Sequence, residues 1–169
     1  MPLIEARGEK PQLSEDVYVA ESAQLVGAVK IGARSSVWCN TTLRADVMPI
    51  EIGYETNIQD NSVLHGTFGK YKCIVGNRVT IGHSVILHGC QIGDRCLIGM
   101  GSIVMDGVQI GAESIVGAGS LVTEGKTFPE KSLIIGRPAK FVRELTLDEI
   151  NFLEQSADNY LLYKTWYKK

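Results

Sequence analysis

Histidine is scarce in this sequence, with three residues in 169, and aromatic residues make up only 7%. No stretch approaches the 18 consecutive apolar residues of a membrane-spanning helix, and the first residues lack the apolar core of a signal peptide. The four cysteines form no C-x-x-C pair, which argues against a thiolate zinc site or a redox motif. The formal net charge of −2 gives no indication of binding to nucleic acid or to an anionic membrane. We therefore expect a cytoplasmic protein that binds neither nucleic acid nor membrane.

Aliphatic residues, by contrast, recur with a period of six. Fifteen positions, arranged as five triplets with six-residue spacing, all hold Ile, Leu or Val. They are Ile31, Val37, Leu43, Ile52, Ile58, Leu64, Val75, Ile81, Leu87, Ile92, Ile98, Val104, Ile110, Val116 and Val122. Three hexads make one coil of about 18 residues, and stacked coils bury continuous aliphatic columns. The period predicts an all-β repeat fold, because a β-sandwich would need alternation of period two over longer strands.

The spacing between coils predicts where extra residues lie. Leu43 and Leu64 are 21 residues apart, and residues 48–51 can hold the excess over one coil. Leu64 and Leu87 are 23 residues apart, which predicts a loop of about five residues near positions 67–72.

The repeat is expected to end near Val122, with irregular connections at 127–130 and 136–139. Thr146 and Glu149 then have the spacing of a capping box. The apolar residues that follow at helical spacing predict an α-helix packed on this repeat domain or on that of a neighbour. The chain divides into an N-terminal segment 1–16, a repeat domain 17–143 and a C-terminal helix 146–167.

The three histidines fall on two consecutive coils of the repeat. His65 and His88 each follow a leucine that holds the same position in its coil, so their imidazoles should stack on one outer face. Arg44 belongs to the same column one coil earlier, whereas His83 is expected on a different face, around a corner. Three such prisms about a threefold axis could bring His83 of one subunit to the other two histidines of its neighbour. Three neutral imidazoles leave one position on Zn²⁺ for water, as in catalytic zinc sites.

Two motifs and the three histidines, set in hexapeptide repeats, resemble the γ-class carbonic anhydrases. The motifs are Leu43-Arg44-Ala45-Asp46 and Asn57-Ile58-Gln59-Asp60, and the likeness covers roughly residues 17–143. The helix with Asn159-Tyr160 and Tyr163 resembles the bacterial branch of that family. The resemblance implies a left-handed parallel β-helix and a homotrimer with Zn²⁺ at each subunit interface, Fe²⁺ or Co²⁺ being the alternative metals. It also implies the reversible hydration of CO₂ to bicarbonate.

The resemblance also assigns roles to individual residues. His65 and His88 would bind the metal from one subunit, and His83 from the next. Gln59 would form a hydrogen bond to the metal-bound water, and Asn57 would orient Gln59.

Around these residues, Arg44 and Asp46 would form an ion pair across the interface. The sequence departs from the active members at two positions where those proteins carry acidic residues. Val47 stands where they carry a Glu, and the segment 66–70 is short and contains no acid. Turnover needs proton export, so low hydratase activity is an open alternative. Two residues are candidate substitutes for the missing acids, Asp60 and Tyr160.

Two other functions fit the repeat. A hexapeptide-repeat acyltransferase would use an acyl-CoA and one histidine as a base, without the three metal ligands or the two motifs. A noncatalytic metal-binding or scaffold protein of the same fold would keep the metal site without turnover. Metal analysis beside a CO₂ hydration assay discriminates among the three.

Overall fold

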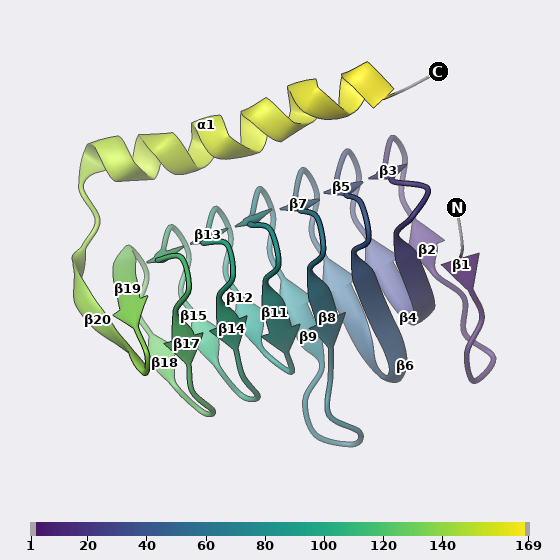
Figure 1. Cartoon of the computed structure of the whole chain (residues 1–169), viewed down its shortest axis with the longest axis horizontal. Helices are drawn as coiled ribbons and strands as arrows, with labels where there is room; N and C mark the ends of the chain where they lie inside the picture. Colours follow the sequence, from purple (N-terminus) through teal and green to yellow (C-terminus); the bar gives the residue numbers. More distant parts are fainter. Residues whose placement is uncertain (1–2, 168–169) are drawn as a thin grey trace.

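The chain is wound into a left-handed parallel β-helix of about seven turns, and one helix runs alongside it (Figure 1). The computed structural model describes residues 3–167. The strands stack in three rows, and β4 (Gln24–Ile31) and β6 (Thr42–Ile52) are long enough to belong to both the first and the second. The first row continues with β1 (Leu3–Ile4), β8 (Val63–His65), β11 (Ile86–His88), β14 (Ile103–Val104) and β17 (Leu121–Val122).

The strands of the other two rows also pair in parallel, apart from the last two strands of the third row, which are antiparallel. The second row contains β2 (Gln12–Leu13), β9 (Cys73–Val75), β12 (Gln91–Ile92), β15 (Gln109–Ile110) and β18 (Thr127–Phe128). The third row contains β3 (Tyr18–Val19), β5 (Ser36–Val37), β7 (Asn57–Ile58), β10 (Thr80–Ile81), β13 (Leu97–Ile98), β16 (Ile115–Val116), β19 (Ser132–Gly136) and β20 (Ala139–Glu144).

The core consists of the aliphatic columns that the period of six predicts. All fifteen positions of the repeat are buried, at 5% exposure or less. Equivalent residues pair in register between coils, as Leu64 does with Leu87 and Ile58 with Ile81. Burying one such side chain stabilises the fold by about 1.5–3 kcal/mol, so the columns provide its main stabilisation.

Both predicted insertions are present, but the first lies at residues 46–49 and not at 48–51, since Ile50 and Glu51 pair in register with β4. Between β4 and β6 the register passes from Gly27–Ala45 to Val29–Ile50, so residues 46–49 stand opposite a single residue. The second insertion is the loop of residues 66–72 between β8 and β9, which an antiparallel bridge between Thr67 and Tyr71 closes.

The expectation that the repeat ends near Val122 is wrong. Phe128 pairs with Ile110 and Ile134 pairs with Val116, so the columns continue for two more hexads. The hairpin of β19 and β20 then closes that end with an antiparallel pair. At the other end β1 and β2 pair with β4, so part of the segment 1–16 joins the sheets, while the domain boundaries stay a prediction.

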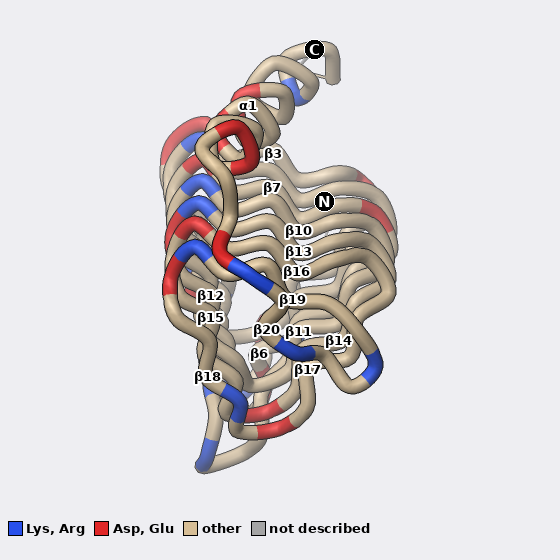
Figure 2. The backbone as a smooth tube through the Cα atoms, turned by 90° about the vertical axis from the view of Figure 1, so that its left-hand side faces the viewer, with Lys and Arg blue, Asp and Glu red and all other residues tan. Residues whose placement is uncertain are grey.

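Charged residues mark one corner of the prism, at the turn before each strand of the third row except β20 (Figure 2). Each turn places a residue other than glycine in the left-handed region, with φ between 52° and 60°. The residues are Asp16, Arg34, Glu55, Arg78, Arg95, Glu113 and Lys131. Nearby glycines allow the backbones of adjacent coils to approach closely. A Cβ on Gly53 would lie 2.5 Å from the carbonyl oxygen of Gly76 in the next coil.

Helix α1 (Leu147–Tyr163) runs from the last coils back towards the first, and ends in the 3₁₀ turn η1 (Lys164–Tyr167) (Figure 1). The predicted capping box is confirmed, since Thr146 and Glu149 each bond the other's backbone N–H. Leu153 and Ala157 are buried against the β-helix of the same chain. Of the residues that the structure describes, none form a helix long and apolar enough to cross a membrane.

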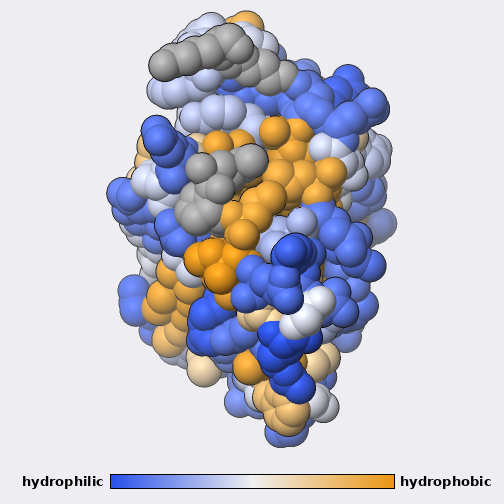
Figure 3. Space-filling view, turned by 90° about the vertical axis from the view of Figure 1, so that its right-hand side faces the viewer, coloured by the Kyte–Doolittle hydropathy of each residue, from blue (hydrophilic) through white to orange (hydrophobic). Residues whose placement is uncertain are grey.

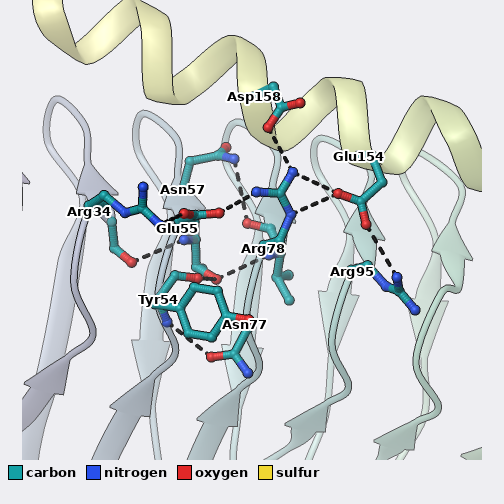
Figure 4. A network of polar contacts seen from close by, with 12 residues as sticks. Arg34, Tyr54, Glu55, Asn57, Asn77, Arg78, Arg95, Glu154 and Asp158 are labelled. Carbon is teal, nitrogen blue, oxygen red and sulfur yellow. Dashed lines mark hydrogen bonds and ion pairs between the residues drawn. The ribbon is translucent and has the colours of Figure 1, made fainter.

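Ion pairs join α1 to the charged corner (Figure 4). The guanidinium of Arg78 contacts Glu55, and it also lies 2.6 Å from Glu154 and 2.7 Å from Asp158 of α1. These carboxylates raise the pKa of Arg78 although its partial burial acts in the opposite direction. Arg78 is therefore a permanent cation that holds α1 on the third row.

Apolar side chains are exposed at the N-terminal end of the prism. Leu3 and Ile4 of β1 are exposed there, and Figure 3 shows a strip of apolar side chains bordered by hydrophilic ones.

Candidate metal centre

His65 and His88 stack on the outer side of the first row. They occupy the same register position in β8 and β11 because each follows a buried leucine of the repeat. The Nδ1 atom of His65 lies 3.1 Å from Nε2 of His88. The predicted stacking of the two imidazoles is confirmed.

A carboxylate contacts one ring nitrogen of each of the three histidines. Asp46 Oδ1 lies 3.2 Å from His65 Nε2, and Asp106 Oδ1 lies 2.8 Å from His88 Nδ1. His83 Nδ1 is 2.8 Å from the carboxylate of Asp60. Such carboxylates favour a proton on the nitrogen that they contact, and so leave the other ring nitrogen as an electron-pair donor.

This arrangement fits a cation between His65 and His88. With both N–H groups directed at carboxylates, His65 Nδ1 and His88 Nε2 turn their electron pairs towards each other over 3.1 Å. Two imidazole nitrogens bound to a tetrahedral Zn²⁺ at about 2.0–2.1 Å are about 3.3 Å apart. Burial lowers the pKa of His65, and the charges of Arg44 and His88 add to this effect. The neutral imidazole, which is the form that binds metals, is thereby favoured.

His83 lies apart from this pair. It occupies the turn between β10 and β11, so it stands on a corner of the prism and not on a sheet face as expected. Within residues 3–167 of one chain, no three His, Cys, Asp or Glu side chains are grouped as a metal site would require. A single chain thus brings two of the three predicted ligands together.

Gln59 and Asn57 form a fixed pair on the third row. Nε2 of Gln59 donates a hydrogen bond of 3.1 Å to Oδ1 of Asn57, and both side chains are buried. Nδ2 of Asn57 in turn donates to Oγ1 of Thr80 at 2.9 Å. The contact that the resemblance implies is present, while the catalytic roles of both residues stay predictions.

Arg44 and Asp46 interact within one chain, at 2.6 Å between Nη1 and Oδ2. Burial alone would raise the pKa of Asp46, but the hydrogen bonds from Arg44 and His65 outweigh it and lower the pKa. Asp46 is therefore an anion at neutral pH and accepts from both side chains. Val47 follows in β6, half-buried beside this ion pair.

The two candidate proton carriers lie together near His83. Tyr160 of α1 and Asp60 line a cavity of about 220 Å³ with Trp38, Tyr163 and other aromatic residues. Burial and the nearby charge of Asp60 raise the pKa of Tyr160 to about 12. The Tyr160 hydroxyl therefore keeps its proton at neutral pH, which makes it a poor base.

Known proteins match this chain over most of its length, in sequence and in fold. The chain is 44% identical over 162 residues to the carbonic anhydrase of Geobacillus kaustophilus, a match that covers 96% of this chain and 88% of that protein. The chain belongs to the gamma carbonic anhydrase family. Gamma carbonic anhydrase 1 of Arabidopsis thaliana, a mitochondrial protein, is 42% identical over 89% of this chain. The chain spans only 56% of that relative's length.

Two further comparisons concern the hexapeptide repeat of the present chain. The bacterial transferase hexapeptide model, which comprises six repeats, matches residues 72–104 and 89–124. A crystal structure of a hexapeptide transferase family protein from Anaplasma phagocytophilum superposes with a TM-score of 0.94 at 43% identity. That match covers 98% of both chains.

Asp106 and Thr67 are the residues of this family member that the sequence analysis missed. Asp106 accepts a 2.7 Å hydrogen bond from the Thr67 hydroxyl on the oxygen that does not contact His88. Asp106 lies one coil beyond Gly89, the residue that follows His88, because Leu87 pairs with Val104. The position one coil beyond His88 is Met105, so Asp106 is the residue that directly follows the extended histidine column.

Proposed function

We propose that this protein catalyses the reversible hydration of CO₂ to bicarbonate at Zn²⁺ sites between the subunits of a homotrimer. The observation that carries the proposal is the pair of ring nitrogens 3.1 Å apart on His65 and His88, each ring held by a carboxylate on its other nitrogen. The names of the relatives support the reaction, and the two stacked histidines support the metal. Fe²⁺ and Co²⁺ bind the same donors and are alternatives.

The third ligand would be the partner subunit's His83. Bound by these imidazoles, Zn²⁺ supplies a Lewis acid that lowers the pKa of water to about 7. Asp46 and Asp106 would hold the two stacked rings, and Asp60 would hold the ring of His83 in the partner's chain. Gln59 would accept a hydrogen bond from the attacking water and turn it towards CO₂.

Exposed aliphatic side chains around the histidine pair support an interface there. Val63 and Ile86 precede the two leucines on the outer side of the first row, and both are about two-fifths exposed, at 38% and 40%. Ile103, which is half-buried, continues the same column on β14. Apolar side chains grouped on one face favour contact with another subunit over contact with water.

A subunit-mixing experiment tests the shared site. His65→Ala and His83→Ala chains, purified separately, should each bind little zinc, since each disrupts every interface. When the two variants are co-expressed, they form mixed trimers. In each mixed trimer one interface combines His65 and His88 of a His83→Ala chain with His83 of a His65→Ala chain. Random mixing in a cyclic trimer predicts about a quarter of the wild-type zinc and of its CO₂ hydration.

Each outcome of the mixing experiment has a clear meaning. Co-expressed His65→Ala and His88→Ala chains are the matched control and should restore nothing, because both changes affect the same half of the site. Recovery in this control, or none in the first mixture, would overturn the shared site. A monomer that holds one tightly bound zinc per chain would do the same.

The transferase description of the Anaplasma phagocytophilum relative favours an acyltransferase as the second candidate function. Such an enzyme would bind an acyl-CoA and would keep its activity after metal removal. Zinc-loaded protein that neither hydrates CO₂ nor transfers an acetyl group from acetyl-CoA would support the noncatalytic alternative. The cytoplasmic location stays a prediction.

A further inference from the structure

A row of polar side chains is buried between α1 and the third row of strands. Ser36, Asn57 and Thr80 stand in register on β5, β7 and β10, and each is at most 4% exposed. In the following coils the same column becomes apolar, with Leu97, Ile115 and Leu133. Burying polar groups under a helix stabilises less than apolar packing would, so the polar part of the column has another use.

The hydrogen bonds in this row have a defined direction. Nδ2 of Asn57 lies 2.9 Å from Thr80 Oγ1 and 3.5 Å from the backbone carbonyl of Val79. A carbonyl can only accept, so the amide nitrogen of Asn57 must face this side. Oδ1 of Asn57 then faces Gln59 and accepts from its Nε2 at 3.1 Å. The side-chain oxygen of Gln59 is thereby turned away from Asn57 and is available as an acceptor.

Helix α1 provides the last member of this chain of contacts. The hydroxyl of Ser156 donates a hydrogen bond of 3.1 Å to Thr80 Oγ1. Ser156 is 9% exposed. Its neighbours on the helix are the buried residues Leu153 and Ala157, and Asp158, which is ion-paired with Arg78. Thr80 Oγ1 thus accepts two hydrogen bonds, one from the Ser156 hydroxyl of α1 and one from Nδ2 of Asn57.

We infer that Thr80 and Ser156 are positioning residues for Gln59, so that α1 fixes the direction of the side-chain amide that faces the reacting water. The chain of hydrogen bonds runs from Ser156 to Thr80, then to Asn57, then to Gln59. The inference rests on the proposed function for the role of Gln59, but the orientation of the amides is a property of this chain alone. Without the Thr80 oxygen, Asn57 keeps only the longer contact with Val79, and both amides gain freedom to rotate.

The test uses full-length, zinc-loaded protein with Thr80→Val, Thr80→Ser and Ser156→Ala. Valine keeps the shape and branching of threonine, while serine keeps the hydroxyl. We expect Thr80→Val to lower kcat about tenfold and Ser156→Ala about threefold, with KM and zinc content unchanged. Thr80→Ser should restore kcat to near the wild-type value. Crystal structures of Thr80→Val should show the Asn57 and Gln59 amides rotated or in two orientations.

Asp158→Asn is the matched control, since it weakens the docking of α1 through Arg78 without touching the hydroxyl chain. Wild-type kcat and unchanged amides in Thr80→Val would overturn the inference. A loss in Asp158→Asn equal to that in Ser156→Ala would also overturn it, because general loosening of α1 would then explain both. If the wild-type protein does not hydrate CO₂, the proposed function fails. The crystal structures still decide whether Thr80 orients the two amides.

Discussion

The carboxylate of Asp106 joins His88 to the loop of residues 66–72. One of its oxygens lies 2.8 Å from His88 Nδ1, and the other accepts a 2.7 Å hydrogen bond from Thr67. Burial would raise the pKa of Asp106, but the hydrogen bonds from Thr67 and His88 lower it. Asp106 is therefore an anion at neutral pH, and it favours the His88 tautomer whose Nε2 can bind a metal.

Replacing Asp106 should weaken metal binding without removing a ligand. We expect Asp106→Ala to lower zinc affinity about 10- to 100-fold and Asp106→Asn to lower it less, because an amide oxygen can still accept from Nδ1. Competition with a chelator of known affinity measures both. Asp148→Asn, an exposed acid at the start of α1, is the control. Wild-type affinity in Asp106→Ala would show that the orientation of His88 does not depend on this carboxylate.

The stability of the helix start should depend on pH through Glu149. Hydrogen bonds from Arg143 and from the Thr146 backbone lower the pKa of Glu149 from 4.5 to about 2. A lowered carboxyl pKa stabilises the fold above the unfolded value, and this contribution is lost as pH falls from about 4.5 to about 2. We expect Glu149→Gln to lower Tm at pH 7, and the difference from wild type to shrink by pH 3.

Thermal unfolding followed by circular dichroism at both pH values tests this prediction. Glu130→Gln, at another exposed position, is the control for the loss of one negative charge. A Tm difference that stays constant from pH 7 to pH 3 would show that ionised Glu149 is not the source.

Arg78 should be the residue on which the docking of α1 depends most. Arg78→Ala would leave Glu55 with Arg34 alone at a site where Glu55 is 6% exposed, and would free Glu154 and Asp158 from their shared partner. We expect a loss of about 1–3 kcal/mol in the free energy of unfolding, and faster hydrogen exchange in α1 than in the strands. The exposed Lys140→Ala is the control. Equal changes in exchange across the whole chain would contradict a local role.

Proton export should limit the reaction. Val47 and the acid-free loop of residues 66–72 supply no carboxylate near the histidine pair, and the pKa of Tyr160 is about 12. We expect turnover at fixed pH and ionic strength to rise with the concentration of an imidazole buffer, because the buffer carries the proton away. Val47→Glu should raise turnover in weak buffer, with Val47→Gln as the uncharged control. Fast turnover without dependence on buffer would show that another residue, such as Asp60, already performs this step.

The period of six made the core and the histidine pair predictable because both depend on local register. Leu64 and Leu87 hold equivalent positions, so the residues that follow them must stack. The end of the repeat was not predictable in the same way. Phe128 and the proline after it interrupt the aliphatic pattern, yet a terminal coil has no further coil above it and can bury a larger side chain.

The corner position of His83 and the buried row beneath α1 depend on contacts between distant segments. Ser156 and Thr80 are 76 residues apart, and no spacing rule connects a helix with the coil on which it lies. The path of α1 back along the prism decides that contact. Sequence patterns predicted the helix and its cap, but not the coils that it touches.

The return of α1 to the first coils changes how this solenoid can unfold. In a simple array of repeats each coil contacts only its neighbours, so the ends can fray independently of the middle. Here the buried Nζ of Lys164 bonds to the backbone oxygens of Asp16 and Arg34 at 2.9 Å each, while the same helix is continuous with β20 on the last coil. The two ends of the array are therefore linked by one rod, and neither can open without disturbing the other. Coils that would otherwise melt one by one should unfold as a single cooperative unit.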